Sequence, residues 1–464
     1  MTDTQFDIAV IGGGPGGYVA AIRAAQLGLK PVVIEREHLG GICLNWGCIP
    51  TKALLRAAEL RHSIDEMAAF GITVGEVKID LGAVVKRSRK VAGRLSMGVR
   101  HLLKKNKVTV IEAEAKIGSA QGGLRQITLS SGDAVLAKHI IIATGARARA
   151  LPNIAADGKT VLTYREAIIP ETMPESLIIV GSGAIGSEFA SFYHDMGVAV
   201  TLVEAMGRIL PVEDAEVSDF VQKSFEKRGI NVMTAVKLQS VTSDANGVTA
   251  VLEGHDKPLQ ASRMILAVGI TGNNENLGLE GTKIRVDRGH ITTDEWGATG
   301  EAGIYAIGDV TGPPWLAHKA SHEGIICVEK IAGMSDVHAI GVGAVPGCTY
   351  CRPQVASVGM TEVAAKQAGH DLKVGRFPFA GNGKAIALGD DGGFVKTIFD
   401  AKTGELLGAH MVGPEVTELI QGYAIARTLE ATEAELMATI FPHPTLSESM
   451  HESVLDAYDR AIHF

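Results

Sequence analysis

A strand, a glycine-rich turn, a helix and a second strand follow one another twice in this chain of 464 residues. The turns are GGGPGG (Gly12–Gly17) and GSGAIG (Gly181–Gly186), and each pattern closes on a glutamate 18 positions after the last glycine of its turn. The equivalent positions, each pair 169 residues apart, are Gly12 and Gly181, Gly14 and Gly183, Gly17 and Gly186, and Glu35 and Glu204. One such turn is weak evidence, but two in the same register predict two α/β dinucleotide-binding units. Two unrelated tight turns are the alternative.

The residue types of this repeat suit a dinucleotide. Glycine lets the backbone approach a pyrophosphate at a helix N-terminus, where free N–H groups and the helix dipole favour negative charge. Glu35 and Glu204 end the second strand of each unit, where a carboxylate accepts hydrogen bonds from ribose hydroxyls and repels a 2′-phosphate. Because Arg208 is the only base shortly after Glu204, the second unit favours NAD over NADP. Two sites predict one tightly held and one exchanging dinucleotide, and hence electron transfer.

The pattern of the chain changes towards its C-terminus. Apolar segments that end in glycine, His139–Gly145 and Arg263–Gly269, close the two units. From about residue 342, alternating strands are followed by helices, which predicts a separate α+β domain. We therefore expect domains at residues 1–149, 150–270, 271–342 and 343–464.

Composition argues against several other classes of protein. The 55 glycines and 16 prolines show no Gly-X-Y period, unlike collagen, and the formal net charge of −8 argues against a nucleic-acid partner. The segment Met1–Asp7 has no basic residue, unlike a secretory signal, and the uncharged stretch Ile8–Ile22 is too short to span a membrane. The odd count of 5 cysteines favours a reducing compartment, so we expect a cytoplasmic protein.

Two cysteines stand close together directly after the first unit. Cys43 and Cys48 lie in GGICLNWGCIPTKAL, and a pair so close can cycle between dithiol and disulfide with little backbone movement. We interpret them as redox-active, with two inert thiols as the alternative, and no second ligand pair of matching spacing supports a metal site. Lys52, one helical turn after Cys48, is either a solvated lysine or a cation that favours a reduced, anionic flavin.

A histidine near the C-terminus is a candidate base. His443 stands between two prolines in FPHPTLSES, and prolines fix the loop around it. Glu448 is expected in the first turn of the next helix, where its carboxylate can hold the imidazole in one tautomer. Such a pair can take a proton from an incoming dithiol near neutral pH. A structural histidine is the alternative.

Three other features have plainer interpretations. Cys348 and Cys351 (CTYC) are read as structural thiols, with a second redox or metal function as the alternative. Cys327 lies in an apolar helical run and is expected in the core. The segment Lys86–Lys107 carries nine basic residues and no acid, which predicts a solvated helix face or a docking site for an acidic partner.

Together these motifs resemble the dihydrolipoamide dehydrogenases, flavin disulfide reductases that serve 2-oxoacid dehydrogenase complexes. The resemblance runs along nearly the whole chain and includes GGICLNWGCIPTKALL, GSGAIGSEFAS, GIYAIGDV, LAHKASHEG and HPTLSE. It implies Rossmann-like domains for FAD at 1–149 and for NAD at 150–270. It also implies that 271–342 completes the FAD site and that 343–464 forms the interface of a homodimer.

The resemblance further implies roles for individual residues. Asp309 would contact the ribityl chain of FAD, and Glu188 would pair with Lys52 beside the flavin. The other residues implied near the cofactors are Thr144, Gly145, Trp315, Leu316, Ala317 and His318 for FAD and Gly269 for NAD. His443 and Glu448 would act in trans, completing the active site of the partner subunit.

The implied reaction is the oxidation of protein-bound dihydrolipoyl groups by NAD+. His443 would take a thiol proton, the substrate thiolate would attack Cys43, and electrons would pass from Cys48 through FAD to NAD+. Lipoyl domains and the core of a 2-oxoacid dehydrogenase complex are the implied partners, with no nucleic acid or membrane.

Three rival functions are less well supported. A glutathione-type reductase would want arginines after Glu204, and a mercuric reductase a C-terminal cysteine pair. A non-catalytic assembly subunit would not need the Cys pair and the base. The chain departs from the family in having GITGN at 269–273, which leaves NAD contacts at that loop open.

Overall fold

The computed structural model describes residues 4–152, 154–341 and 343–464. The chain divides into two compact units. The first comprises Met1–Leu54, Asp80–Arg149 and Gly269–Ile340, and the second comprises Leu55–Ile79, Ala150–Val268 and Gly341–Phe464. The predicted FAD-binding and central segments thus fall largely in one unit, and the predicted NAD-binding and interface segments in the other.

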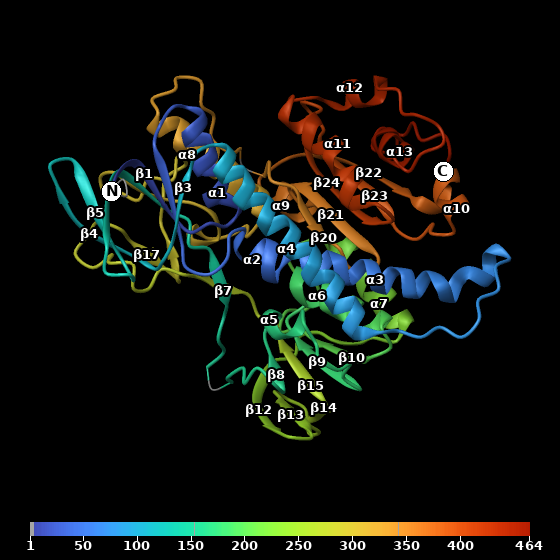
Figure 1. The fold of residues 1–464 in the computed structure, drawn as a ribbon. Coiled ribbons are helices and arrows are strands. Elements are labelled where there is room, and N and C mark those ends of the chain that lie inside the picture. The colour runs from blue at the N-terminus through green and yellow to red at the C-terminus, as the bar shows by residue number, and fades with distance from the viewer. Residues whose placement is uncertain (1–3, 153, 342) are drawn as a thin grey trace. The chain divides into compact units, whose positions relative to one another are not determined.

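The first unit is built on a sheet in the order β3-β2-β1-β6-β5-β4, with β19 also paired to β6 (Figure 1). Its strands are β1 (Gln5–Ile11), β2 (Pro31–Glu35), β3 (Thr109–Glu112), β4 (Ala115–Gln121), β5 (Leu124–Leu129), β6 (Ala134–Ile142) and β19 (Ile304–Ala306). The pairs among β3, β2, β1, β6 and β19 are parallel, whereas β4 and β5 extend the sheet antiparallel. Ile8, Ala9 and Val10 of β1 are fully buried, as expected for a strand covered on both faces.

Helices of the first unit pack closely where glycine allows it. They are α1 (Pro15–Gln26), α2 (Gly41–Trp46), α4 (Leu81–Lys105) and α8 (Ala317–Ile331). A Cβ on Gly16 of α1 would lie 2.9 Å from the Ala320 carbonyl oxygen, and a Cβ on Gly324 would lie 2.7 Å from the Gly16 carbonyl oxygen. The first turn of α1 is thereby brought close to residues 320–324 of α8. Short elements complete the unit: β7 (Ala146–Ala148), β16 (Ile270–Gly272), β17 (Val286–Asp287), β18 (His290–Ile291) and η2 (Gly308–Thr311).

The second unit contains its own parallel sheet, in the order β11-β10-β9-β15-β8. The strands are β8 (Val161–Leu162), β9 (Ser176–Val180), β10 (Ala199–Val203), β11 (Asn231–Met233) and β15 (Arg263–Leu266), with helices α5 (Tyr164–Ala167), α6 (Ala184–Asp195) and α7 (Ala215–Arg228). An antiparallel sheet of β12 (Leu238–Asp244), β13 (Gly247–Leu252) and β14 (Leu259–Ala261) is inserted before β15. The repeat seen in the sequence therefore becomes two similar parallel sheets.

The C-terminal part of the second unit is an antiparallel sheet in the order β20-β21-β24-β23-β22, with helices packed on it. Its strands are β20 (Gly347–Thr349), β21 (Gln354–Gly359), β22 (Leu372–Pro378), β23 (Phe394–Asp400) and β24 (Leu406–Gly413). Its helices are α9 (Glu362–Gln367), η3 (Phe379–Gly381), α10 (Gly383–Leu388), α11 (Val416–Thr428), α12 (Glu433–Ala438) and α13 (Glu448–Asp456). Every residue of β24 is buried, so this strand forms the centre of the region.

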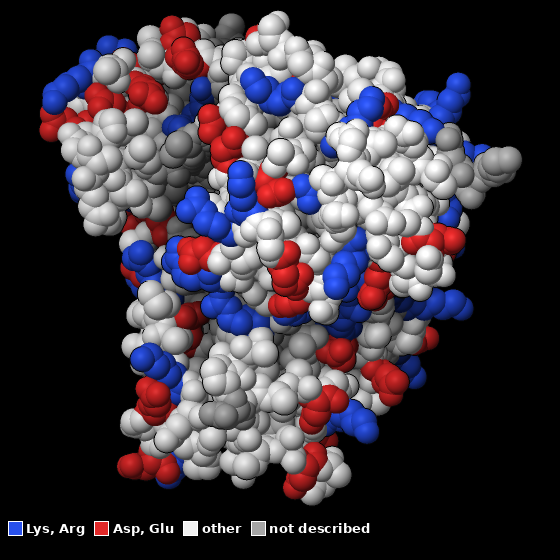
Figure 2. Space-filling view, turned by 90° about the vertical axis from the view of Figure 1, so that its left-hand side faces the viewer, with Lys and Arg blue, Asp and Glu red and all other residues white. Residues whose placement is uncertain are grey.

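Helix α3 (Cys48–Glu66) begins in the first unit, and its C-terminal part, followed by η1 (Met67–Phe70), belongs to the second. No helix in the described part of the chain is long and apolar enough to cross a membrane. On the face drawn in Figure 2, basic and acidic side chains alternate without gathering into one large patch.

Candidate active site

The first glycine turn has a backbone that side chains would block. Gly12 has φ +107°, and a Cβ there would lie 2.3 Å from the Ala143 carbonyl oxygen, at the end of β6. A Cβ on Gly17 would lie 2.0 Å from the Gly12 carbonyl oxygen. Gly14, by contrast, is the N-cap of α1 and carries no side-chain cap hydrogen bond. The tight turn thus leaves the amide end of α1 available to an anion.

The second turn repeats this geometry. Gly181 has φ +97°, and its Cβ would lie 2.3 Å from the Ala267 carbonyl oxygen, while a Cβ on Gly186 would lie 1.8 Å from the Gly181 carbonyl oxygen. Gly183 caps α6 without a side-chain hydrogen bond, and a Cβ there would meet nothing within 4 Å. Both turns therefore fit a pyrophosphate that approaches the backbone closely.

The glutamates that follow the second strands are tied back to the turns. Glu35 accepts a 2.6 Å hydrogen bond from the Gly13 amide and a 2.8 Å bond from the Glu37 amide. The carboxylate is thus fixed beside the turn, where a ribose would extend from the pyrophosphate.

Glu204 is held in the same way and more tightly. It is buried, and its Oε2 accepts from both the amide and the hydroxyl of Ser182, at 2.9 and 2.6 Å. Its Oε1 accepts from the Met206 amide at 2.8 Å. Sequence reasoning missed Ser182, because nothing in the turn pattern distinguishes a serine that anchors the acid from a small turn residue.

The cysteine segment lies directly against the first glycine turn. The Gly40 amide donates to the Gly13 carbonyl at 2.8 Å, and a Cβ on Gly41 would lie 2.9 Å from the Gly14 Cα. Gly40 has φ +90°, a left-handed conformation that favours glycine. The fold therefore places the redox candidates beside the first nucleotide turn.

Cys43 and Cys48 are in contact as two thiols. Cys43 lies in α2 and Cys48 begins α3, and the two helices meet at Gly47. The hydrogen bond between the two thiols, together with burial, raises the pKa of Cys43 well above its usual value. The charge of Lys52 acts in the opposite direction. A pair in contact in this way can close to a disulfide with little movement of the backbone.

Asp309 lies near this pair and adds to the rise in the pKa of Cys43. Burial raises the pKa of Asp309 to about 6, with Lys319 opposing the rise and Glu323 adding to it. Glu323 accepts a 2.7 Å hydrogen bond from the Gly308 amide. A buried carboxyl at this position fits the hydroxyl groups of a ribityl chain, which would satisfy it.

The residues predicted around the flavin lie in the same unit. Leu316 is the N-cap of α8, which starts at Ala317 and includes His318. The Trp315 ring lies 5.8 Å from the ring of His290, and its buried Nε1–H has no hydrogen-bond partner among the described residues. An unpaired buried donor beside the N-terminus of α8 is consistent with a polar cofactor there.

Thr144 and Gly145 are joined to the loop that departs from the family pattern. The Thr144 hydroxyl donates to the Asn273 carbonyl at 2.6 Å, and Asn273 Nδ2 donates to the Thr144 carbonyl at 3.0 Å. The Asn273 amide donates to Gly145 at 2.9 Å. Gly269 has φ +101°, and its carbonyl accepts from Arg149. The 269–273 loop is thus hydrogen-bonded to Thr144, Gly145 and Arg149 of the same unit despite its different sequence.

His443 and Glu448 form the predicted pair. Nδ1 of His443 lies 2.9 Å from Oε1 of Glu448, which is the first residue of α13. Burial alone would raise the pKa of Glu448, but hydrogen bonds from the Thr445 amide and His443 outweigh it and lower the pKa. An ionised carboxylate on Nδ1 leaves Nε2 as the proton acceptor. The His443 side chain is 79% exposed in the single chain.

The remaining candidates have plain surroundings. Glu188 is buried in α6 and accepts a 3.0 Å hydrogen bond from the Tyr350 amide, so its predicted pairing with Lys52 stays a prediction. The Cys348 thiol donates to the Thr417 carbonyl, and burial raises the pKa of Cys351 to about 12. Cys327 is fully buried, as expected of a core thiol.

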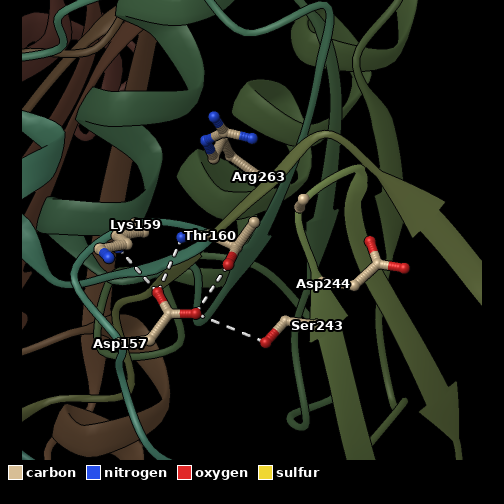
Figure 3. A pocket seen from close by; sticks show the side chains of 7 residues that line it. Asp157, Lys159, Thr160, Ser243, Asp244 and Arg263 are labelled. Carbon is tan, nitrogen blue, oxygen red and sulfur yellow. Dashed lines mark hydrogen bonds between the residues drawn. The ribbon is translucent and has the colours of Figure 1, made fainter.

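A hollow in the second unit, drawn in Figure 3, carries no such chemistry. Asp157 accepts hydrogen bonds there from the amides of Lys159, Thr160 and Val161 and from the Thr160 hydroxyl. These bonds hold the loop and lower the pKa of Asp157, although burial opposes them. The Asp157 carboxylate therefore stabilises the turn at residues 157–161.

Comparisons with known proteins agree with this geometry. Residues 6–324 match the family model of the pyridine nucleotide-disulphide oxidoreductases, and residues 345–454 match the dimerisation domain of that family. The dihydrolipoyl dehydrogenases of Rhizobium etli and Bacillus subtilis are 58% and 45% identical to the chain; each alignment covers 99% of it, and 99% and 100% of the relative. The crystal structure of LpdA from Mycobacterium tuberculosis aligns with a TM-score of 0.91 at 30% identity, covering 97% of this chain and 99% of that one.

The chain belongs to the pyridine nucleotide-disulphide oxidoreductases. These matches confirm the predicted fold class and the resemblance to the dihydrolipoamide dehydrogenases. They also confirm the prediction of a disulfide oxidoreductase with FAD and NAD as cofactors. The dimerisation domain supports the predicted homodimer.

Proposed function

We propose that this oxidoreductase oxidises protein-bound dihydrolipoyl groups to lipoyl groups with NAD+ as the acceptor. The observation that carries the proposal is the contact between Cys43 and Cys48 in a segment packed on the first glycine turn. A dithiol substrate needs a disulfide that it can reduce by exchange, and this pair is in position to form one. The similarity to dihydrolipoyl dehydrogenases over the whole chain supports the same reaction.

The first unit would hold FAD through the turn, Glu35, Thr144 and Gly145, with Asp309 and the segment from Trp315 to His318 around the rest of the cofactor. When bound, FAD supplies electron transfer between the dithiol and NAD+. The second unit would hold NAD through Gly181, Gly183, Gly186 and Glu204. The family resemblance also assigns Gly269 to NAD, and it pairs Glu188 with Lys52 beside the flavin. The anchored Glu204 carboxylate suits a ribose with two free hydroxyls and repels a 2′-phosphate.

His443 would serve as the base. With Glu448 fixing Nδ1, Nε2 takes a proton from one substrate thiol. The resulting thiolate attacks Cys43, which breaks the Cys43–Cys48 disulfide, releases Cys48 as a thiolate and forms a mixed disulfide between the substrate and Cys43. The second substrate thiol loses its proton to the released cysteine thiolate, attacks the substrate sulfur of the mixed disulfide, displaces Cys43 and closes the lipoyl disulfide. Two electrons and two protons thus leave the substrate, and Cys43 and Cys48 become a dithiol.

The setting of the enzyme follows from the same features. Because His443 is exposed in the single chain, we propose that it completes the active site of the partner subunit in the homodimer. Lipoyl domains and the core of a 2-oxoacid dehydrogenase complex are the proposed partners, and the cytoplasm is the proposed location. The four predicted domains at 1–149, 150–270, 271–342 and 343–464 remain our proposed division of the chain.

An assay of the purified, flavin-containing protein tests the proposal. We expect it to reduce NAD+ with dihydrolipoamide and to leave oxidised glutathione unreduced by NADPH. Cys43→Ser and Cys48→Ser should each lower turnover by more than about a thousandfold, because the exchange disulfide is lost. Cys348→Ser is the matched control, since Cys348 lies in the C-terminal sheet, where its thiol donates to the Thr417 carbonyl of α11, and it should keep wild-type turnover. Near-normal rates in either active-site variant, or a preference for glutathione and NADPH, would contradict the proposal.

A further inference from the structure

Arg89 of the basic helix α4 contacts the linker between Cys43 and Cys48. Nη1 of Arg89 donates a hydrogen bond to the Asn45 carbonyl, and the guanidinium carbon lies 4.5 Å from the centroid of the Trp46 ring. Asn45 and Trp46 both lie between Cys43 and Cys48 in the chain. A single side chain from a distant helix therefore holds two consecutive residues of the linker between the two thiols.

The same linker is tied down on its other side. Asn45 is buried, and its Nδ2 donates to the carbonyls of Leu39 and Gly41 at 3.0 and 2.9 Å. The hydroxyl of Ser96, which lies about two helical turns after Arg89 on α4, donates to the Leu39 carbonyl, and its Oγ lies 3.3 Å from Asn45 Oδ1. The linker is thus clamped by α4 at two points, with Arg89 the charged one.

Arg89 differs from its neighbours on α4. Lys86, Lys90 and Arg94 are exposed to solvent, as expected for a solvated basic face. Arg89 is half-buried, and burial lowers its pKa, although an arginine remains charged in proteins. A half-buried charge held by a carbonyl and an aromatic face is a specific contact, because a planar guanidinium satisfies both at once.

We propose that Arg89 is a positioning residue for the Cys43–Cys48 pair: by gripping Asn45 and Trp46 it keeps the two thiols in contact and so favours the disulfide over the dithiol. Holding two groups in the reacting geometry raises their effective concentration. The disulfide is therefore stabilised relative to the dithiol, because the fold has already brought the two sulfurs together. The proposal deepens the proposed function, since that function depends on the same disulfide.

The equilibrium between dithiol and disulfide tests this role directly. The full-length, flavin-containing protein is equilibrated with buffers of reduced and oxidised glutathione, quenched in acid, alkylated and digested. Mass spectrometry of the peptide that carries Cys43 and Cys48 then gives the oxidised fraction. In this reaction the two thiols lose two electrons and two protons, and oxidised glutathione becomes two molecules of the reduced form.

Removing the guanidinium should make the disulfide less stable. For Arg89→Met we expect the equilibrium constant for disulfide formation to fall about tenfold, which corresponds to a rise of about 30 mV in the potential of this two-electron couple. Arg89→Lys keeps the charge but not the planar contacts, so it should fall between this variant and the wild type. The matched control is Arg94→Met, which removes an exposed arginine from the same helix and should stay within about twofold of the wild type.

Trp46→Leu completes the test, because it removes the aromatic partner and leaves the Asn45 carbonyl in place. If Arg89 acts through this contact, the two changes remove the same interaction. The fall in the equilibrium constant of the double variant Trp46→Leu with Arg89→Met, expressed as a free energy, should then be smaller than the sum of the two single-variant effects. An unchanged equilibrium constant in Arg89→Met, or an equal change in Arg94→Met, overturns the proposal. If Arg89→Met does not fold, Arg89→Lys and Trp46→Leu must show the fall, and wild-type values in both overturn it.

The experiment separates this proposal from the proposed function. Glutathione equilibration uses neither dihydrolipoamide nor NAD+, so the effect of Arg89 is measured whatever the substrate. A wild-type protein that fails to oxidise dihydrolipoamide overturns the proposed function alone. A tenfold fall in Arg89→Met would then still assign the positioning role.

Discussion

The two glycine turns have nearly the same backbone but different surroundings. In both, glycines are required where a Cβ would strike a carbonyl oxygen at about 2 Å, as at Gly17 and Gly186. The first turn is overlaid by the cysteine segment, with Gly41 in contact with Gly14, and its helix α1 is crossed by α8. At the second turn, a Cβ on Gly183 would meet nothing within 4 Å, and Ile185 is 38% exposed.

This difference separates two kinds of feature in a nucleotide site: those that suit the bound nucleotide and those that decide how long it stays bound. The tight turn and the anchored glutamate recur in both units, and both are features that would bind a pyrophosphate and a ribose. The cover over the turn decides whether a dinucleotide is retained or exchanged. The covered turn beside the thiols suits a retained FAD, and the open turn suits an NAD that must leave after each cycle.

The largest effect should come from filling the first turn, with the same change in the second turn as its matched comparison. Gly17→Ala places a methyl group about 2 Å from the Gly12 carbonyl, and Gly186→Ala does the same at Gly181. Overpacking of this kind forces the backbone apart. We expect Gly17→Ala to be purified with less than about a tenth of its flavin and to be inactive. Gly186→Ala should remain yellow while NAD+ reduction falls by about a hundredfold.

Flavin absorbance per chain and steady-state NAD+ reduction measure these two outcomes. Gly98→Ala is the control, because it lies on an exposed part of α4 where an added Cβ would meet nothing within 4 Å. It should keep both flavin and activity. Equal flavin loss in Gly17→Ala and Gly186→Ala would mean that the two turns do not hold different dinucleotides.

A change at the candidate base should leave both nucleotide turns intact. His443→Gln removes the proton acceptor, so dihydrolipoamide oxidation should fall by about 10²–10⁴-fold. Flavin content and the KM for NAD+ should stay at wild-type values, because His443 lies in neither glycine turn. Glu448→Gln should cause a smaller loss, since the imidazole remains but loses the carboxylate on Nδ1. A parallel loss of flavin would show that the change disturbs the fold rather than proton transfer.

Much of this organisation could be predicted from the sequence, because its signals are local. The glycine turns, Glu35 and Glu204, the Cys43–Cys48 spacing and the prolines around His443 each lie within a few residues or a fixed offset. They also led to the confirmed fold class and family. The repeat predicted two parallel sheets for the same reason, since each strand, turn and helix is contiguous.

What the sequence missed depends on contacts between distant segments. Lys396 looks like an exposed residue in the strand FVKTIFD, yet its side chain is 1% exposed, because carboxylates from remote segments neutralise it. Strand β22 (Leu372–Pro378) was not predicted, since LKVGRFP has a glycine inside it and a proline at its end. Arg89 was read with the rest of a basic face, because helical spacing does not reveal which side meets Asn45 and Trp46.

A change at the second acid should sharpen the contrast at the level of ribose recognition. Glu204→Gln keeps the shape of the side chain but replaces charge-assisted hydrogen bonds to the ribose, worth about 1.5–3 kcal/mol each, by neutral ones worth about 0.5–1.5 kcal/mol. We therefore expect the KM for NAD+ to rise by about 10- to 100-fold, with flavin content unchanged. Initial rates at varied NAD+ measure the effect. Glu35→Gln is the matched variant and should reduce flavin retention while leaving the KM for NAD+ alone, so the reverse pattern would exchange the two assignments.

The smallest expected effect concerns a cluster of ion pairs within the second unit. The Lys396 ammonium contacts Asp214, Glu216 and Glu362 at 2.9, 2.7 and 2.8 Å, which joins α7 and α9 to β23. Hydrogen bonds from Arg376 and then Lys396 lower the pKa of Glu216 from 4.5 to about 2. Since the folded state holds the ionised form, this stabilisation is complete above about pH 4.5 and is lost as the pH falls towards 2.

Glu216→Gln removes this titration. At pH 7 the variant should unfold about 1–2 °C below the wild type, a small change because Glu216 is 39% exposed and solvent screens its charge. Between pH 5 and pH 3 the Tm of the wild type should fall more steeply, so that the two curves converge. Calorimetry across this range measures both, and curves that stay parallel would show that the Glu216 carboxylate does not stabilise the second unit. Convergence would instead place part of the acid sensitivity of the second unit in the contact between α7 and the C-terminal sheet, away from its glycine turn.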